Sequence, residues 1–184
     1  MVSQCIKTCY ANLKQFQSIR HSLNRETKLM LVTSCILGRL DYCNILLANS
    51  SKTLIKRLQK VVNASIRFIC NLKMIQSVTP YMKQCHILPV EQRIKFKSCT
   101  LMYKIINGLA PEYLSTMVFP EAGNRDNLRS GTDLLCMKLP NCSKCIQYSM
   151  IQNWNELSYE LRSQENLSKF KKKLKTHYFT CAFQ

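Results

Sequence analysis

The clearest helical pattern in the chain lies in residues 51–72, SKTLIKRLQKVVNASIRFICNL. Its apolar side chains recur at intervals of three and four residues, the spacing that places them on one face of an α-helix. That face comprises Leu54, Leu58, Val61, Val62, Ser65 and Ile69. The other side is basic and comprises Lys52, Lys56, Arg57, Lys60 and Arg67. The pattern predicts a helix from Ser51 to about Leu72 with a buried face and a cationic face.

Similar periodicity predicts helices on both sides of this segment. Asn24 is a favourable N-cap for one of them. Thr79 and Pro80 together suit a helix start, and Gly108 is placed to end a later helix that opens at Pro89. The expected helical ranges are 3–20, 24–48, 80–85, 89–108, 111–117 and 166–179, with a short helix near Trp154. In the range 89–108, a buried ridge of Val90, Ile94, Leu101 and Ile105 is expected beside a basic row of Arg93, Lys97 and Lys104.

Residues 120–145 break this helical pattern because they concentrate Gly, Pro, Asn and Asp. We expect a loop there with one short strand between Leu134 and Leu139. The predicted fold class is mainly α: an irregular helical bundle with a loop-rich segment carrying at most one short strand or hairpin. Three segments are expected, over residues 1–72, 73–118 and 119–184, the last ending in a basic helix.

The charge of the chain points to an anionic partner. Its 184 residues include 27 Lys and Arg against 10 Asp and Glu, a net charge of +17. Nucleic acid is the commonest partner for such an excess, and an anionic membrane surface is the next. Few aromatic residues accompany the cations, so binding of the RNA or DNA backbone is expected without sequence preference. The candidate contacts are Lys52, Lys56, Arg57, Lys60, Arg67, Arg93, Lys97, Lys104, Lys171, Lys172, Lys173 and Lys175.

Eleven cysteines are scattered along the chain, several of them within apolar helical stripes. Buried thiols explain these positions better than a disulfide framework does. No secretory signal and no apolar run long enough to span a bilayer is visible. We therefore expect an intracellular protein, nuclear or cytoplasmic. Cys142 and Cys145 have the spacing of a zinc knuckle or redox pair, but no second cysteine pair supplies the other two zinc ligands. Coincidence is the favoured interpretation, so neither a metal nor a cofactor is expected.

Several motifs of the chain occur in a fixed order and spacing. They are Arg39-Leu40-Asp41-Tyr42-Cys43-Asn44, Leu58-Gln59-Lys60-Val61-Val62-Asn63-Ala64 with Arg67, Thr79-Pro80, His86-Ile87-Leu88-Pro89-Val90, Arg93-Ile94-Lys95-Phe96-Lys97, Tyr103-Lys104, Asn107-Gly108-Leu109-Ala110-Pro111, Tyr113-Leu114, Leu128-Arg129-Ser130, Trp154-Asn155-Glu156-Leu157 and Phe170-Lys171-Lys172-Lys173-Leu174-Lys175. In these motifs the chain resembles the region after the palm in reverse transcriptases of non-LTR retrotransposons, the jockey-like lineage. It departs from that family at Ile87, where tryptophan is usual, and at Ser158, where proline is usual.

The resemblance implies that residues 1–72 correspond to a polymerase thumb and the remainder to a C-terminal extension. In the parent enzyme this region would grip the template–primer duplex. A palm supplied by another chain is a further candidate partner. Met1 falls where the family pattern is already inside the reading frame, so we expect the protein to start midway through it.

Polymerases of this kind hold two magnesium ions on clustered aspartates. Catalysis is not expected here because the sequence lacks such a cluster. The chain has three Asp (Asp41, Asp126 and Asp133) and no adjacent acidic pair. Asp41 is expected to make a structural hydrogen bond or to pair with Arg39 or another nearby cation. The predicted function is that of a non-catalytic reverse-transcriptase remnant with weak nucleic-acid binding. The alternatives are a helical protein-interaction module and a translated pseudogene fragment without function.

Overall fold

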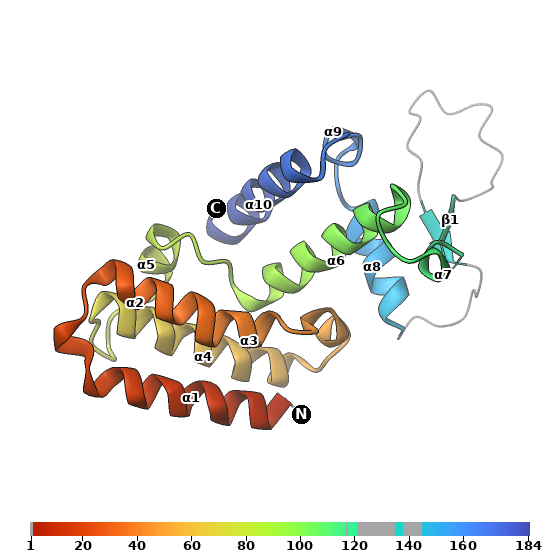
Figure 1. Cartoon of the computed structure of the whole chain (residues 1–184). Helices are drawn as coiled ribbons and strands as arrows, with labels where there is room; N and C mark the ends of the chain where they lie inside the picture. The colour runs from red at the N-terminus through yellow and green to blue at the C-terminus, as the bar shows by residue number, and fades with distance from the viewer. Residues whose placement is uncertain (1, 117, 121–134, 138–144) are drawn as a thin grey trace. The chain divides into compact units, whose positions relative to one another are not determined.

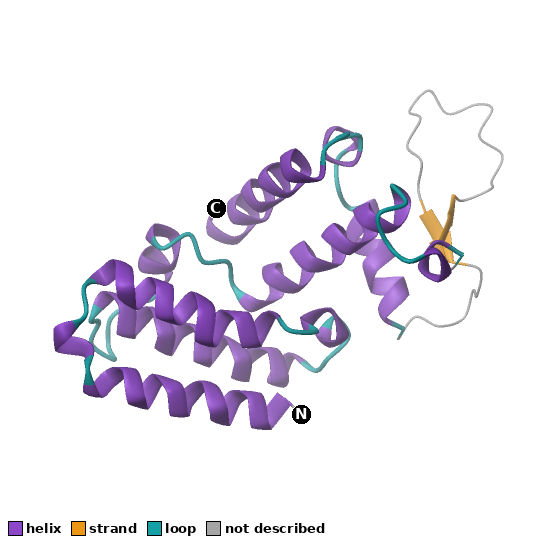
Figure 2. Ribbon diagram, viewed as in Figure 1, coloured by secondary structure: helices purple, strands orange, loops and turns teal. Residues whose placement is uncertain are grey.

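The computed structural model describes residues 2–116, 118–120, 135–137 and 145–184. Helices dominate this part of the chain, which confirms the predicted mainly α class (Figure 2). The chain divides into two compact units, Met1–Ile94 with Phe179–Gln184, and Lys95–Tyr178. These units differ from the three segments expected from the sequence, because one long helix continues through the boundary at Ile94 and the last residues of the chain belong to the first unit.

Three long helical stretches form most of the first unit. α1 and α4 pack together, and α2 also packs against α4 (Figure 1). Shorter turns connect them, and α5 follows α4 along the chain. The elements are α1 (Val2–Ser18), a 3-10 turn (Arg20–Ser22), α2 (Arg25–Val32), a π-helical turn (Thr33–Leu37), α3 (Gly38–Asp41), a second 3-10 turn (Asn44–Leu47), α4 (Lys52–Cys70) and α5 (Thr79–Gln84).

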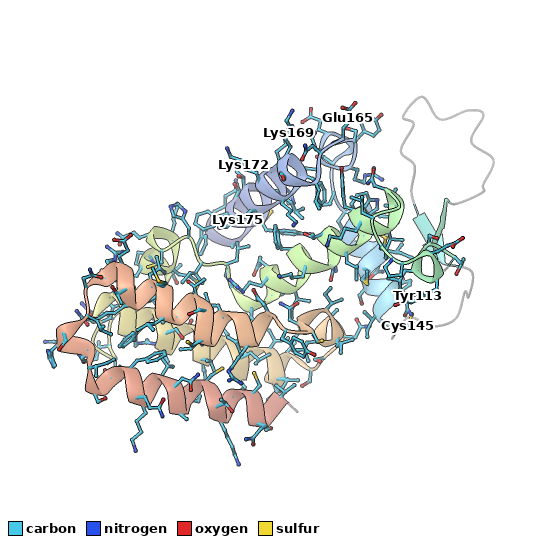
Figure 3. The ribbon with its side chains drawn as sticks, viewed as in Figure 1. Tyr113, Cys145, Glu165, Lys169, Lys172 and Lys175 are labelled. Atoms are coloured by element: carbon cyan, nitrogen blue, oxygen red, sulfur yellow. The ribbon has the colours of Figure 1, made fainter. Side chains whose placement is uncertain are left out.

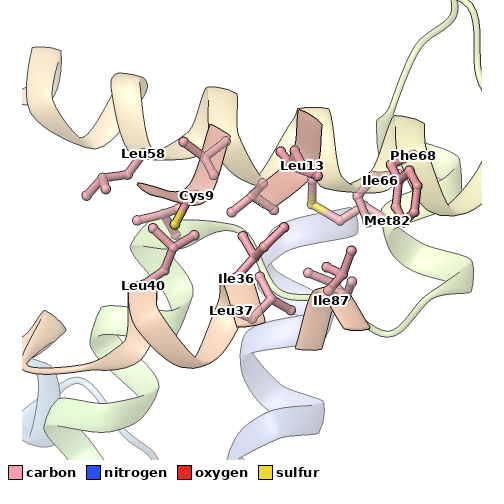
Figure 4. Close-up of a cluster of buried hydrophobic side chains, with 14 of the residues drawn as sticks. Cys9, Leu13, Ile36, Leu37, Leu40, Leu58, Ile66, Phe68, Met82 and Ile87 are labelled. Atoms are coloured by element: carbon pink, nitrogen blue, oxygen red, sulfur yellow. The ribbon is translucent and has the colours of Figure 1, made fainter. Parts of the chain in front are cut away.

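The core of the first unit is built on the apolar face of α4. Leu58, Val61, Val62, Ser65 and Ile69 are buried as predicted, whereas Leu54 is only half-buried. Ile66 and Phe68 are buried on the same helix. Opposite them lie Cys9 and Leu13 from α1, Ile36, Leu37 and Leu40 from the second helical stretch, and Met82 and Ile87 from the region of α5 (Figure 4).

Three predicted helix boundaries need correction, one of them the end of the last helix, which lies at Phe183 rather than Phe179. The helix expected over residues 24–48 does start after Asn24, whose Oδ1 accepts the backbone N–H of Thr27 at 2.7 Å. It ends at Asp41 rather than near Ala48, because Cys43 adopts a left-handed conformation with φ 52°. Thr79 is the first residue of α5 and not its cap, while Pro80 occupies the first turn as predicted.

The second unit is organised around an aromatic cluster. The ring centroids of Tyr103 and Phe170 lie 4.4 Å apart in a stacked arrangement, and Trp154 lies 5.8 Å from Phe170. The Tyr103 hydroxyl donates to the backbone oxygen of Gln164 at 2.7 Å. The elements are α6 (Val90–Ile106, starting in the first unit), α7 (Glu112–Ser115), β1 (Val118–Pro120), β2 (Leu135–Met137), α8 (Ile146–Asn155), α9 (Tyr159–Arg162) and α10 (Leu167–Phe183).

The strand predicted near Leu134 to Leu139 is β2, and it pairs with β1 in an antiparallel two-stranded sheet. The hairpin is within the predicted class, although the position of β1 was not foreseen. Gly108 follows α6 with φ 66°, a conformation that glycine adopts without steric cost, so its predicted role in ending that helix is confirmed. In the ridge expected on α6, Val90, Ile94 and Ile105 are buried and Leu101 is half-buried.

Candidate nucleic-acid interface

Helix α4 is held at both ends by side-chain contacts. The Ser51 hydroxyl accepts the N–H of Leu54 at 3.3 Å, an N-cap of the expected kind. At the other end, Asn71 turns the chain with φ 53°, and its Oδ1 accepts from the Nζ of Lys28 at 3.1 Å. Lys28 is buried, with its Nζ 5.8 Å from the ring centroid of Phe68. These contacts anchor both ends of α4, while its apolar stripe determines which face meets the core.

The outward side of α4 carries exposed cations, as the sequence predicted. We call Lys52, Lys56, Lys60 and Arg67 the α4 basic face, with Arg57 at its edge. All of these except Arg67 are exposed. No acidic residue occurs in α4, and the whole stretch 1–94 contains only Glu26, Asp41 and Glu91. The charges of Lys52, Lys56 and Lys60 are therefore not offset by carboxylates on their own helix.

Arg57 and Arg67 are partly engaged within the protein. The Nη2 of Arg57 lies 3.5 Å from the hydroxyl oxygen of Ser3 at the start of α1. The Nη2 of Arg67 donates to the backbone oxygen of Met74 at 3.4 Å. Arg67 is half-buried, and its Nε is enclosed without a hydrogen-bond partner within the described residues. Arg67 thus contributes both to the fold and to the charge of the surface.

A groove of about 500 Å³ lies in the first unit beside the α4 basic face. Its walls combine apolar and polar side chains, and Lys56 and Arg67 face a single acidic residue there, Glu91. The lining residues are Ile55, Lys56, Gln59, Asn63, Arg67, Val78, Thr79, Met82, Pro89, Glu91, Gln92, Ala182 and Phe183. The lining residues from α5 and the start of α6 are uncharged except for the acidic Glu91, so the positive charge of the groove comes from α4 alone.

The basic row predicted on α6 is less available. Arg93 forms a two-point ion pair with Asp41, with Nε–Oδ1 and Nη2–Oδ2 distances of 2.8 and 2.5 Å. Only 18% of the Arg93 side chain and 20% of the Asp41 side chain are exposed. Asp41 therefore has the structural role expected of it, with Arg93 as its partner, and we leave Arg93 out of the proposed interface. Lys97 and Lys104 are half-buried in the second unit.

A second group of cations lies on α10. Phe170, Leu174 and Tyr178 are buried, so the lysines between them turn outward. Lys172, Lys173 and Lys175 are exposed, as is Lys169, whereas Lys171 is half-buried (Figure 3). Lys172 and Lys173 line a shallow hollow of about 480 Å³ together with Glu160, Leu161 and Thr176. Glu160 places a negative charge in this hollow, as Glu91 does in the groove beside α4.

Sequence reasoning left several exposed cations of the first unit out of the predicted interface, among them two on α1. Lys7 and Lys14 both lie on the solvent side of α1, away from Cys9 and Leu13. Their seven-residue separation places them on one helical face, a signal that was available in the sequence. They add positive charge to the first unit outside α4. Their replacement therefore serves as a control when the contribution of the α4 basic face to binding is measured.

Several cysteines are buried thiols, as predicted. Burial raises the pKa of Cys9 and of Cys99 to about 12, and that of Cys70 to about 11. The Cys99 Sγ lies 3.2 Å from the Tyr178 hydroxyl and 3.4 Å from the Asn153 backbone oxygen. Within the described ranges, no three His, Cys, Asp or Glu residues are grouped to hold a metal ion. Cys142 lies outside those ranges, so the interpretation of its spacing from Cys145 stays a prediction.

No family of known proteins, no curated protein and no solved structure matches this chain. The reverse-transcriptase resemblance therefore rests on the sequence motifs. Among the described helices, none combines the length and apolar character needed to cross a bilayer.

Proposed function

We propose that the chain is a non-catalytic helical segment related to the thumb and post-palm region of non-LTR reverse transcriptases. In this proposal it binds the RNA or DNA backbone through the α4 basic face. The observation that carries the proposal is the row of exposed Lys52, Lys56 and Lys60 on a helix without acidic residues. The proposed family rests on the sequence resemblance, and the proposed mode of binding rests on the exposed lysines of α4.

The spacing of this row suits a phosphate backbone. Lys52, Lys56 and Lys60 succeed one another at four-residue intervals, about 6 Å along the helix axis. That interval is close to the separation of successive phosphates, so one lysine can neutralise each of several neighbouring charges. Each neutralised phosphate releases condensed counterions, which makes binding strongly dependent on salt. The face provides no aromatic side chain for stacking, so the proposal includes no base preference.

Several residues of the quoted motifs contact one another in the folded chain. Asp41 and Arg93, from two separate motifs, form the ion pair described above. The Oε1 of Gln59 accepts the N–H of Val90 at 2.9 Å, which joins two further motifs. In the second unit, Lys95 and Glu156 approach to 3.4 Å. Residues that carry the resemblance thus contact one another, as expected if the family pattern encodes this packing.

The proposal assigns no catalytic step to the chain. Asp41 is the only aspartate among the described residues, and its two carboxylate oxygens both bind the Arg93 guanidinium. That pairing leaves it poorly suited to hold a catalytic magnesium ion, which requires convergent carboxylates.

The proposal is tested by measuring the affinity of the chain for labelled duplex DNA over a range of salt concentrations. The triple variant Lys52→Gln, Lys56→Gln, Lys60→Gln removes three backbone contacts. Its slope of log affinity against log salt should be shallower by about 2 to 3 than that of the unmodified chain. The matched control is Lys7→Gln, Lys14→Gln, Lys83→Gln, which lowers the net charge equally on other exposed positions of the same unit. Equal slopes for the two triples would show that total charge, not the α4 basic face, governs binding.

One observation favours a second function, that of a protein-interaction module. Met74 and Ile75 follow α4 and are 81% and 97% exposed. Apolar side chains this exposed gain free energy when a partner covers them. Capture of a protein partner after nuclease treatment, abolished by Met74→Asp with Ile75→Asp, would support this alternative. A bound partner that nuclease removes would instead support nucleic-acid binding.

A further inference from the structure

Three side chains converge where α4 and α5 end. Cys70 is the last residue of α4, Cys85 directly follows α5, and Arg25 is the first residue of α2. The two sulfur atoms lie 3.8 Å apart. The Nη2 of Arg25 lies 3.8 Å from the Cys85 Sγ. All three belong to the first unit, and the proposed interface uses none of them.

The positions of the two cysteines leave room for them to approach. A disulfide requires a sulfur–sulfur distance of about 2.05 Å, so the sulfurs must close by less than about 2 Å. Each cysteine lies at the C-terminal end of its helix, and the chain turns immediately afterwards at Asn71 and His86, with φ values of 53°. Rotation of the side chains and small shifts at these helix ends can supply the movement without unwinding either helix.

The two thiols differ in access to solvent. Cys70 is half-buried, whereas only 9% of Cys85 is exposed. A small disulfide reagent therefore reaches Cys70 more readily than Cys85. Burial raises the pKa of Cys70 to about 11, and the Arg25 guanidinium beside the pair offsets only part of that rise, so exchange requires alkaline pH.

We propose that Cys70 and Cys85 are a site of reversible oxidation, forming an intrachain disulfide when the protein meets an oxidised low-molecular-mass disulfide such as oxidised glutathione. The Cys70 thiolate attacks one glutathione sulfur, forms a mixed disulfide and releases the other glutathione as a thiolate. Cys85 then loses its proton to solvent and attacks the Cys70 sulfur. The mixed disulfide breaks and the second glutathione leaves. Two protein thiols are oxidised while one glutathione disulfide is reduced to two thiols.

The bond would close a loop over residues 71–84, which contains α5 and the exposed Met74 and Ile75. Closing a loop of this length restricts the unfolded chain. The thermal unfolding midpoint of the oxidised protein should therefore rise by roughly 5–10 °C relative to the reduced protein.

The test uses the full chain incubated with oxidised and reduced glutathione at mildly alkaline pH, then blocked with a thiol-alkylating reagent and digested with trypsin. Burial raises the pKa of Cys70, so alkaline conditions increase its thiolate fraction. The expected product is one cross-linked pair of peptides, residues 68–73 and 84–93, in a protein about 2 Da lighter than the reduced form. Prior unfolding in denaturant should abolish the preference for this pair.

Single variants separate the two steps. Cys85→Ser should leave Cys70 as a stable mixed disulfide with glutathione, because no second thiol resolves it. Cys70→Ser should leave Cys85 largely unmodified, because Cys85 is buried. Cys5→Ser is the matched control and should retain the cross-link. A stable glutathione adduct on Cys70 of the unmodified folded chain, or preferential linkage of another cysteine pair, would overturn the proposal.

Discussion

At the scale of single residues, Asp41 and Arg93 illustrate what the sequence could and could not predict. The lone aspartate in an apolar helical region indicated a structural role, because a buried carboxylate needs a partner. The partner was not predictable, since Arg93 lies 52 residues further along the chain and the nearer Arg39 is exposed. The folded chain selects the arginine that reaches the carboxylate with two hydrogen bonds.

This pair should couple strongly in a double-mutant cycle. Two-point contact between charged groups that are mostly shielded from water should give a coupling free energy of about 1 to 2 kcal/mol. Asp41→Asn, Arg93→Gln and the double variant, compared by urea unfolding, measure it. DNA affinity of the double variant should stay within about twofold of the unmodified chain if neither residue contacts phosphate. A coupling free energy near zero would show that the ion pair does not stabilise the fold.

Cys99 predicts how stability changes at alkaline pH. Burial raises the pKa of its thiol from 9.0 to about 12. In the unfolded chain the thiol loses its proton above pH 9, whereas in the folded chain it stays neutral, so its contribution to stability falls as pH rises. Between pH 8 and pH 10.5 the unmodified protein should lose roughly 2 kcal/mol more than Cys99→Ser, whose hydroxyl does not titrate there. Parallel stability profiles for the two proteins would contradict the burial of this thiol.

At the scale of secondary structure, local chemistry predicted some helix boundaries and missed others: the cap expected at Asn24 is confirmed, whereas the cap expected at Thr79 is wrong. The Asn24 side chain accepts a backbone N–H as expected. Ser51, which the sequence pattern placed at the start of the helix, caps α4 in the same way. Prediction failed near Cys43, where the sequence has neither glycine nor proline to mark a break. Cys43 nevertheless adopts a left-handed conformation, which nothing in the local pattern indicates.

The turn at Cys43 leads to a prediction about stability. A side chain at φ 52° costs about 1 to 2 kcal/mol of local strain that glycine avoids, partly offset by the greater freedom of glycine in the unfolded chain. Because Cys43 is exposed, little packing is lost on its replacement. Cys43→Gly should raise the free energy of unfolding by about 0.5 kcal/mol relative to Cys43→Ala, which keeps the strain. The reverse order in urea unfolding would argue against the left-handed turn.

At the scale of the whole molecule, long-range contacts decide the organisation. The final residues of α10 belong to the first unit, where Phe179 lies 5.6 Å from His86 between ring centroids. No local signal in the sequence predicts such a return. The cationic surface of α4 was predictable because helical periodicity assigns its residues to faces. The unavailability of Arg93 was not, because it depends on this long-range packing.

A net charge of +17 favours non-specific attraction to any polyanion, so the proposal depends on where on the surface the nucleic acid would bind. The binding site is located by measuring how far DNA protects each lysine from acetylation. The chain is acetylated with and without excess duplex DNA at moderate salt, and the extent of acetylation at each lysine is measured by mass spectrometry. Lys52, Lys56 and Lys60 should be protected several-fold, whereas Lys7 and Lys83 should change little. Uniform protection of all exposed lysines, or protection confined to α10, would contradict a binding site on α4.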